Sequence, residues 1–392
     1  MKLLQNLKLA LGILAVAGLA ACGGGGGGGG NSSADSGTLR LAMTDAPSCG
    51  YDAVNVTVVK VRVHQSSSAG DNDSGWSEIV LNPARRLNLL NLTNGVLDEL
   101  GQTPLPTGKY TQLRLVLADN GGATPFANSV IPTGGAEVAL KTPSGQQSGV
   151  KANINIDIAA NKMADFVLDF DACKSVVAAG GSGKYLLKPV VAVIPRYVSG
   201  VAGFVGLATL ANGNTNLSLQ QAGVVIKATA PDNTGRFVLQ PVAPGAYTLV
   251  MTAPGRTTMV VTNVAVSADT VTSVNASGTA LNSPVSLSGT ATGTAPADTL
   301  VRALQPLTGG STIEVAGRFV DSTTGVYSYP LVVNAPLVAP YVPIPGLLVF
   351  IADAAVAGKY TLKAGLTGFA DKASVLPTLV ASGTITTNFL FP

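Results

Sequence analysis

Aliphatic and polar residues alternate along several stretches of this chain, and this two-residue period constrains the fold more than any other feature. The clearest case is residues 153–158, where Ile154, Ile156 and Ile158 alternate with asparagine and aspartate. Successive side chains of a strand point to opposite faces, so the three isoleucines share one face. Residues 39–43 repeat the pattern. We therefore expect an all-β chain built from half-buried strands.

The alternating valines of residues 54–63 change phase between Val58 and Val59. A one-residue slip inside a strand moves the apolar set to the other face, so it predicts a β-bulge at this point. Residues 87–100 predict a turn with one short helix near Val96.

Strands are also expected at residues 113–117, 166–170 and 186–194, where aliphatic and aromatic side chains recur. Together with the strands before them, they predict an N-terminal antiparallel β-sandwich over residues 38–197.

Six segments within residues 38–196 resemble, in order, a bacterial lipoprotein domain catalogued as domain of unknown function 4382. They read LRLAMTDAP, YDAVNVTVVKVRVH, LPTGKYTQLRLVL, LKTPSGQQSGVK, LDFDACKSVV and YLLKPVVAVIP. The resemblance implies an exported β-domain without an established activity.

Three short motifs occur twice in the rest of the chain. SGVAG at 199–203 returns as SGTATG at 288–293, TGRF at 234–237 as TGVY at 324–327, and GAYTL at 245–249 as GKYTL at 358–362. Their order resembles carboxypeptidase-regulatory-like or Cna-B-like domains of the carbohydrate-binding-like fold group. The resemblance implies two smaller immunoglobulin- or transthyretin-like β-sandwich repeats, at residues 199–279 and 286–392.

The second repeat carries an insertion at residues 331–352 that is nearly all apolar and has no charged residue. Its length is that of a membrane span, but four prolines argue against a helix. We expect an extended loop packed on its own sandwich. The alternative is an exposed apolar patch that contacts a partner.

The N-terminus has the architecture of a secretory signal peptide, with two lysines followed by an uncharged apolar run at residues 9–20. The Leu-Ala-Ala-Cys tetrad that ends at Cys22 resembles the lipobox of bacterial lipoproteins. This resemblance implies that residues 1–21 are a lipoprotein signal peptide and that Cys22 carries diacylglycerol and a further acyl chain such as palmitate. Gly23 stands where an aspartate favours the inner membrane, so the outer membrane is expected. The alternative is an ordinary signal peptide cut elsewhere, which leaves Cys22 as a free thiol.

Residues 22–37 are rich in glycine and serine and predict a flexible linker. Cys49 and Cys173 are the two cysteines that remain once Cys22 is lipidated. In an oxidising compartment such a pair tends to form a disulfide, and two unpaired buried thiols are the alternative.

Asp169 and Asp171 flank Phe170 and lie on the same face of a predicted strand. Two carboxylates so placed are candidates for a Ca²⁺ site or an acid/base pair, with Asp45 and Asp157 as further acidic candidates, or they are solvated ends of an edge strand. We expect no cofactor, and the sequence leaves open whether these aspartates bind a metal.

The single histidine, His64, ends a valine strand and is expected to be a surface residue. Tyr247 and Tyr360 follow glycine in the repeated motif and are expected to be core aromatics with hydroxyls at a sandwich corner, with sugar stacking as the alternative. Cna-B-like domains form Lys–Asn cross-links promoted by an acidic residue. Residues 199–279 have Lys227 without any glutamate, and residues 286–392 have Glu314, Lys359 and Asn388; this signal is weak, and we carry no cross-link over to this chain.

Removal of residues 1–21 leaves 22 basic and 21 acidic residues, a net charge of +1. Such a chain has no electrostatic basis for binding nucleic acid. The sequence predicts a lipid-anchored cell-envelope protein that is not an enzyme, whose partners are the membrane and a carbohydrate or an envelope protein. A structural surface stalk is the second hypothesis and a hydrolase the third.

Overall fold

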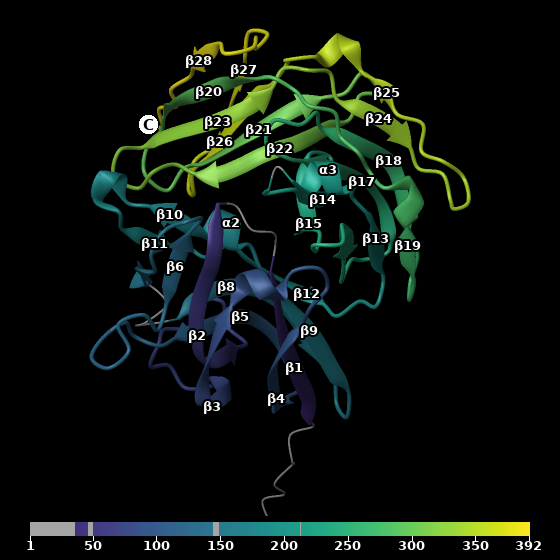
Figure 1. Ribbon diagram of the computed structural model, residues 1–392. Helices are drawn as coiled ribbons and strands as arrows, with labels where there is room; N and C mark the ends of the chain where they lie inside the picture. Colours follow the sequence, from purple (N-terminus) through teal and green to yellow (C-terminus); the bar gives the residue numbers. More distant parts are fainter. Residues whose placement is uncertain (1–35, 46–49, 144–148, 212) are drawn as a thin grey trace, which may run out of the picture. The chain divides into compact units, whose positions relative to one another are not determined.

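The computed structural model of this protein describes residues 36–45, 50–143, 149–211 and 213–392 (Figure 1). Strands form most of its regular structure and pair into six sheets among these residues, so the all-β prediction is confirmed. In this part of the chain no helix is long and apolar enough to cross a membrane.

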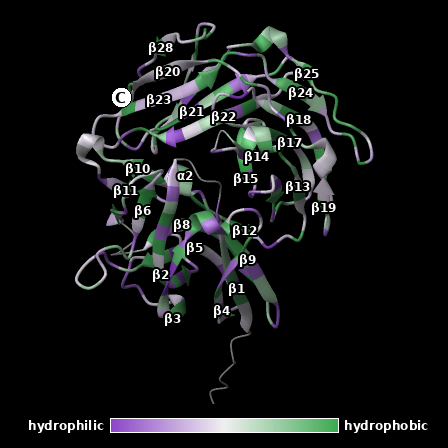
Figure 2. Ribbon diagram, in the orientation of Figure 1, coloured by the Kyte–Doolittle hydropathy of each residue, from purple (hydrophilic) through white to green (hydrophobic). Residues whose placement is uncertain are grey.

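The first β region holds two sheets, one of order β12-β9-β1-β4 and one of order β10-β11-β7-β6-β2-β5-β8 with β3 beside β2. Its strands are β1 (Ser36–Asp45), β2 (Tyr51–His64), β3 (Ser77–Asn88), β4 (Asp98–Pro106), β5 (Gly108–Leu117), β6 (Ser129–Pro132), β7 (Val138–Lys141), β8 (Val150–Ile158), β9 (Met163–Phe170), β10 (Val176–Ala178), β11 (Tyr185–Leu187) and β12 (Val191–Pro195). Figure 2 shows hydrophobic and hydrophilic residues alternating along many of these strands.

The two sheets bury their aliphatic faces in one core, to which Ile154, Ile156 and Ile158 all contribute. The predicted bulge is confirmed, because the pairing of β2 shifts register between Val58 and Lys60. Most pairs are antiparallel, but β1 runs parallel to β9 from Thr38 to Asp45.

The helix predicted near Val96 is wrong. A 3₁₀ helix, η1 (Leu89–Leu92), comes earlier, and Asn88 caps it by accepting a hydrogen bond from the Leu90 N–H at 3.2 Å. Asn94 and Gly95 then adopt φ of 62° and 80°, a left-handed turn that cannot continue a helix. The chain enters β4 directly afterwards.

The second and third β regions each hold two sheets. The strands of the second are β13 (Gly200–Phe204), β14 (Asn216–Gln221), β15 (Val224–Thr229), β16 (Arg236–Leu239), β17 (Gly245–Thr252), β18 (Met259–Val266) and β19 (Val271–Ser273). Those of the third are β20 (Ser288–Thr294), β21 (Leu300–Pro306), β22 (Thr312–Phe319), β23 (Val326–Val332), β24 (Leu337–Pro340), β25 (Ile351–Ala352), β26 (Thr361–Gly365), β27 (Lys372–Val375) and β28 (Thr384–Thr386).

The internal repeat reappears in the order of the strands. The order β16-β13-β19 in the second region matches β23-β20-β28 in the third, and β15-β14-β17-β18 matches β22-β21-β26-β27. In both small sheets the first strand of the region runs parallel to the last. The two regions therefore share one topology.

The insertion supplies β24 and β25, which have no counterpart in the second region. β24 pairs in parallel with β18 from Met259 to Thr262, so it extends a sheet of the second region. The expectation that the insertion packs on its own sandwich is therefore wrong. Met259 and Val261 in β18 are buried, and they provide an apolar edge for the uncharged segment.

Candidate functional site

Seven charged side chains meet where the three β regions contact one another, and we call this group the charged cluster. It consists of Asp45, Asp169, Asp171, Lys174, Lys227, Arg302 and Glu314, joined by the ion pairs and electrostatic contacts given below. Charges buried without partners are costly, so such a group must be internally paired to persist.

The shortest of these ion pairs joins the first and second regions. Lys227 Nζ in β15 donates to Asp169 Oδ1 in β9 at 2.5 Å, and Lys227 is only 2% exposed. Burial raises the pKa of Asp169, while the adjacent Lys227 ammonium opposes that shift. The contact is an ion pair of the kind that destabilises a fold when one partner is removed.

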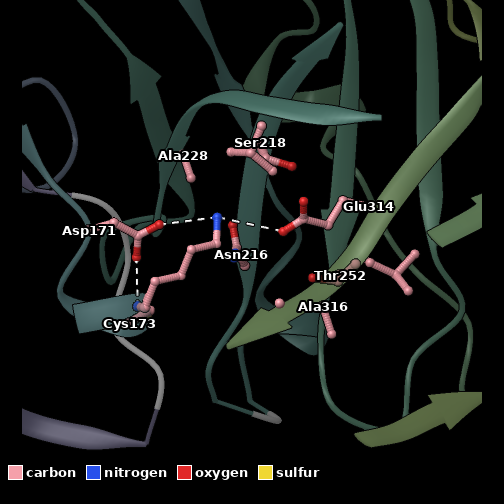
Figure 3. A pocket seen from close by; sticks show the side chains of 12 residues that line it. Asp171, Cys173, Asn216, Ser218, Ala228, Thr252, Glu314 and Ala316 are labelled. Atoms are coloured by element: carbon pink, nitrogen blue, oxygen red, sulfur yellow. Dashed lines mark hydrogen bonds and ion pairs between the residues drawn. The ribbon is translucent and has the colours of Figure 1, made fainter. Parts of the chain in front are cut away.

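A second amine lies between two carboxylates from different regions, as Figure 3 shows for Asp171 and Glu314. Asp171 is the N-cap of α2 (Ala172–Ser175) and accepts the Lys174 N–H at 2.9 Å. Lys174 Nζ lies 3.3 Å from Asp171 Oδ2 and 3.5 Å from Glu314 Oε1 in β22. Burial lowers the pKa of Lys174, but the two carboxylates outweigh it and the net pKa is raised.

Glu314 connects the third region to both others. Arg302 Nε donates to Glu314 Oε2 at 2.6 Å. The side-chain amide of Gln220 in β14 accepts the Glu314 N–H at 2.7 Å and donates to the Glu314 carbonyl at 2.8 Å. Glu314 thus contacts the first region through Lys174, the second through Gln220 and its own region through Arg302.

Asp45 is the one carboxyl of the cluster for which the described residues provide no ion pair, although the Lys227 ammonium acts on it electrostatically. It is 1% exposed, its Oδ1 accepts the Ala172 N–H at 2.9 Å, and its Oδ2 has no hydrogen-bond partner among the residues that the structure describes. Burial raises its pKa well above the ordinary value, the Ala172 N–H opposes this, and the charges of Asp171 and Asp169 add to it. With Asp45 protonated, three carboxylates face three cations and the cluster is neutral.

This arrangement predicts that the contribution of Asp45 to stability falls as the pH rises. The folded state holds a proton on Asp45 at pH values where the unfolded chain has released it, so this contribution is full below the unfolded pKa and is lost through the folded pKa. Asp45→Asn keeps an acceptor for the Ala172 N–H without an ionisable group. We expect the variant to melt at a higher temperature than wild type at pH 8 and to lose that advantage at pH 4. An equal difference at both pH values would contradict the assignment of the proton to Asp45.

The cluster borders a cavity of ≈ 70 Å³ lined by Asp171, Cys173, Lys174, Asn216, Glu314 and other residues (Figure 3). This volume has room for a few water molecules and is far below the roughly 300–1,000 Å³ of small-molecule sites. Two open depressions on the second region are larger. One of ≈ 470 Å³ is lined by residues such as Leu207, Asn214 and Asn233, and one of ≈ 320 Å³ by Gln221, Thr248 and Asn263.

The two aspartates predicted as metal candidates both lie in the cluster, but each contacts an amine. Among the described residues no group of three or more histidine, cysteine, aspartate or glutamate side chains is placed to hold a metal ion. Asp157 lies on β8, opposite Lys109 of β5, and not in the cluster. The geometry therefore gives Asp169 and Asp171 a role in ion pairing.

Cys22 and Cys49 lie outside the described residues, so lipidation and the Cys49–Cys173 disulfide stay predictions. Cys173 lies in α2, directly before Lys174 and two residues after Asp171.

The histidine and the two tyrosines that the sequence singles out each form hydrogen bonds with the backbone. His64 Nδ1 accepts the Ser66 N–H at 2.8 Å and Nε2 lies 3.0 Å from the Ser74 carbonyl, so both ring nitrogens hold the loop after β2. The core role predicted for the two tyrosines is confirmed. Tyr247 is 5% and Tyr360 1% exposed, and each hydroxyl donates to a backbone carbonyl.

Sequence reasoning did not connect Lys174, Lys227, Arg302 and Glu314. A signal was present, because Lys227 and Glu314 each interrupt an apolar strand, in VVIKAT and TIEVAGRF. A lone charge among aliphatic residues indicates a buried, paired group, but it does not name the partner.

Residues 36–189 match the model of a family described as Domain of unknown function (DUF4382). The resemblance predicted for residues 38–196 is confirmed over this range, which is less than half of the chain. No curated protein matches.

Solved structures match at low similarity. A type II cohesin–X-dockerin complex from Acetivibrio cellulolyticus is 22% identical over 22% of this chain and 58% of that chain, with a TM-score of 0.19. The Bacillus anthracis TIE protein is 11% identical over 91% of this chain and 51% of that chain, with a TM-score of 0.17. The Corynebacterium diphtheriae major pilin SpaA is 9% identical over 91% of this chain and its whole length, with a TM-score of 0.19. The chain covers less than two thirds of the length of the dockerin-complex chain and of the TIE protein.

Proposed function

We propose that this protein is a lipid-anchored component of the bacterial cell envelope with a non-catalytic binding role, and that its three β regions act as one folded unit. The observation that carries the proposal is the charged cluster. Its cations contact carboxylates of the cluster. Two of these ion pairs cross from one region to another, Lys227–Asp169 and Lys174–Glu314. Charges that are paired in this way connect the regions and are poorly placed for proton transfer to a substrate.

Contacts between the first and third regions favour a binding unit over a stalk. In a stalk of successive domains each domain contacts only its chain neighbours. Here the Gly180 N–H donates to Asp321 at 2.8 Å, Lys188 pairs with Asp298, and Lys174 pairs with Glu314. The first region therefore contacts the third directly as well as the second.

The partner that we propose is a carbohydrate or an envelope protein, and the depression that includes Asn214 and Asn233 is the place for a small ligand. Amide side chains around an exposed leucine offer donors and acceptors beside an apolar surface. Binding of the mature chain to a glycan array, or a saturable complex with one purified envelope protein, would support this role. If neither is found, the stalk hypothesis is the better account.

The anchor depends on a single sulfur atom. Cys22→Ser is expected to abolish incorporation of a fatty-acid probe and to leave uncleaved precursor, since no thiol remains at that position to carry diacylglycerol. Metabolic labelling followed by electrophoresis measures this, with Cys173→Ser as the matched control that keeps the label. Equal labelling of Cys22→Ser and wild type would contradict the lipobox interpretation.

A further inference from the structure

The inserted segment between β23 and β26 presents a hydrophobic surface that the fold leaves uncovered. Residues 331–352 contain no charged side chain. β24 lies against β18, and β25 is the outermost strand of that six-stranded sheet.

Side chains alternate between core and solvent as the segment approaches β25. Leu348 and Phe350 pack against the core of the second region. Leu347, Val349 and Ile351 are 63%, 67% and 70% exposed. We call these three residues the aliphatic stripe. Exposed aliphatic side chains on consecutive outward positions mark an interaction surface more strongly than scattered ones do.

The turn before the stripe extends the same surface. Val342 and Ile344 are also exposed. Pro343 and Pro345 have no N–H, and the Gly346 N–H donates to the Pro343 carbonyl at 2.8 Å. The two prolines give the turn fewer backbone donors than an ordinary turn has, so the turn itself is poorly suited to pair with an added strand. These features favour contact with lipid over pairing with another β-strand.

We propose that the aliphatic stripe and its turn rest in the interfacial layer of a phospholipid bilayer. This inference rests on the proposed lipid anchor at Cys22, which lies fourteen residues before β1. That length of chain reaches at most about 50 Å, so the anchor would keep the start of β1 within that distance of the membrane. The segment has no basic residue, so the contact is hydrophobic and independent of lipid charge.

Vesicle sedimentation of the mature chain carrying Cys22→Ser tests the surface without the anchor. We expect measurable binding to phosphatidylcholine vesicles that added phosphatidylglycerol or salt leaves unchanged. The triple variant Leu347→Asp, Val349→Asp, Ile351→Asp is expected to weaken binding about tenfold or more, because charged groups oppose burial in the interface. Val375→Asp, Val380→Asp, Leu390→Asp is the matched control, since these aliphatic residues of the third region are 80%, 63% and 77% exposed. The control is expected to bind like the parent.

Fluorescence quenching gives a second test, which detects contact between the stripe and lipid directly. In Leu347→Trp, vesicles with brominated acyl chains are expected to quench the new fluorescence, with the parent, whose one tryptophan is Trp76, as the background. Absence of quenching, or equal loss of binding in the stripe and control variants, would overturn the proposal. So would a concentration-dependent dimer that the stripe variant abolishes in a chain that does not bind vesicles, because the stripe would then be a protein contact. Failure of fatty-acid labelling at Cys22 would refute the anchor and leave these results unaffected.

Discussion

Lys227→Met is expected to lower the free energy of unfolding by about 3–5 kcal/mol. Methionine has a similar volume and fills the space of the lysine stem, but it leaves the Asp169 carboxylate buried without the cation that lies 2.5 Å away. Burial already raises the pKa of Asp169, so part of the loss will be relieved by protonation of that carboxyl at acidic pH. Urea denaturation at pH 5 and pH 8 measures both effects, with the larger loss expected at pH 8.

The control for this substitution is Lys109→Met. Lys109 is an exposed lysine on β5, and surface substitutions of this kind usually change stability by less than about 0.5 kcal/mol. A Lys227→Met variant as stable as Lys109→Met would show that the ion pair adds nothing to the fold.

Loss of the predicted Cys49–Cys173 disulfide is expected to cost about 4–5 kcal/mol, an upper figure from chain entropy. The bridge would close a loop of 124 residues, and crosslinks over long loops restrict the unfolded chain most. Cys173 lies between Asp171 and Lys174, so the bridge would also hold α2 against the charged cluster. Denaturation of Cys49→Ser, Cys173→Ser in the Cys22→Ser background measures the loss.

The pairing itself is read by peptide mapping without a reductant. One linked peptide that contains both cysteines is expected. Alkylation of both thiols in the unreduced protein would mean that they are unpaired, and the stability loss of the serine variants would then require another cause.

The strands could be predicted where burial imposes a period of two. β8 keeps its alternation over all nine residues, because one face packs in the core and the other meets solvent. β4 could not be predicted in this way, since DELGQTPLP has two prolines and few aliphatic residues. Its strand conformation comes from pairing with β1, a partner about sixty residues away in the sequence.

The placement of the insertion and the composition of the charged cluster also depend on contacts between residues far apart in the sequence. Neither could therefore be predicted from the sequence. Nothing in residues 337–340 distinguishes an edge on their own sandwich from an edge on β18. Asp45 and Glu314 are 269 positions apart, and only the folded chain shows that Asp45 lies near Asp171 and Glu314 near Lys174. The strand pattern placed Asp169 and Asp171 on one face, but it could not show the amines that pair with them.

The central claim is that buried ion pairs join the β regions into one unit, and a double-mutant cycle on Asp169 and Lys227 tests it most directly. The cycle compares the unfolding free energies of wild type, Asp169→Leu, Lys227→Met and the double variant. Each single change leaves one buried charge unpaired, whereas the double change replaces the pair with apolar groups and is expected to recover most of the loss. The account predicts a coupling energy of about 2 kcal/mol or more. Additivity of the two single losses within about 0.5 kcal/mol would contradict it.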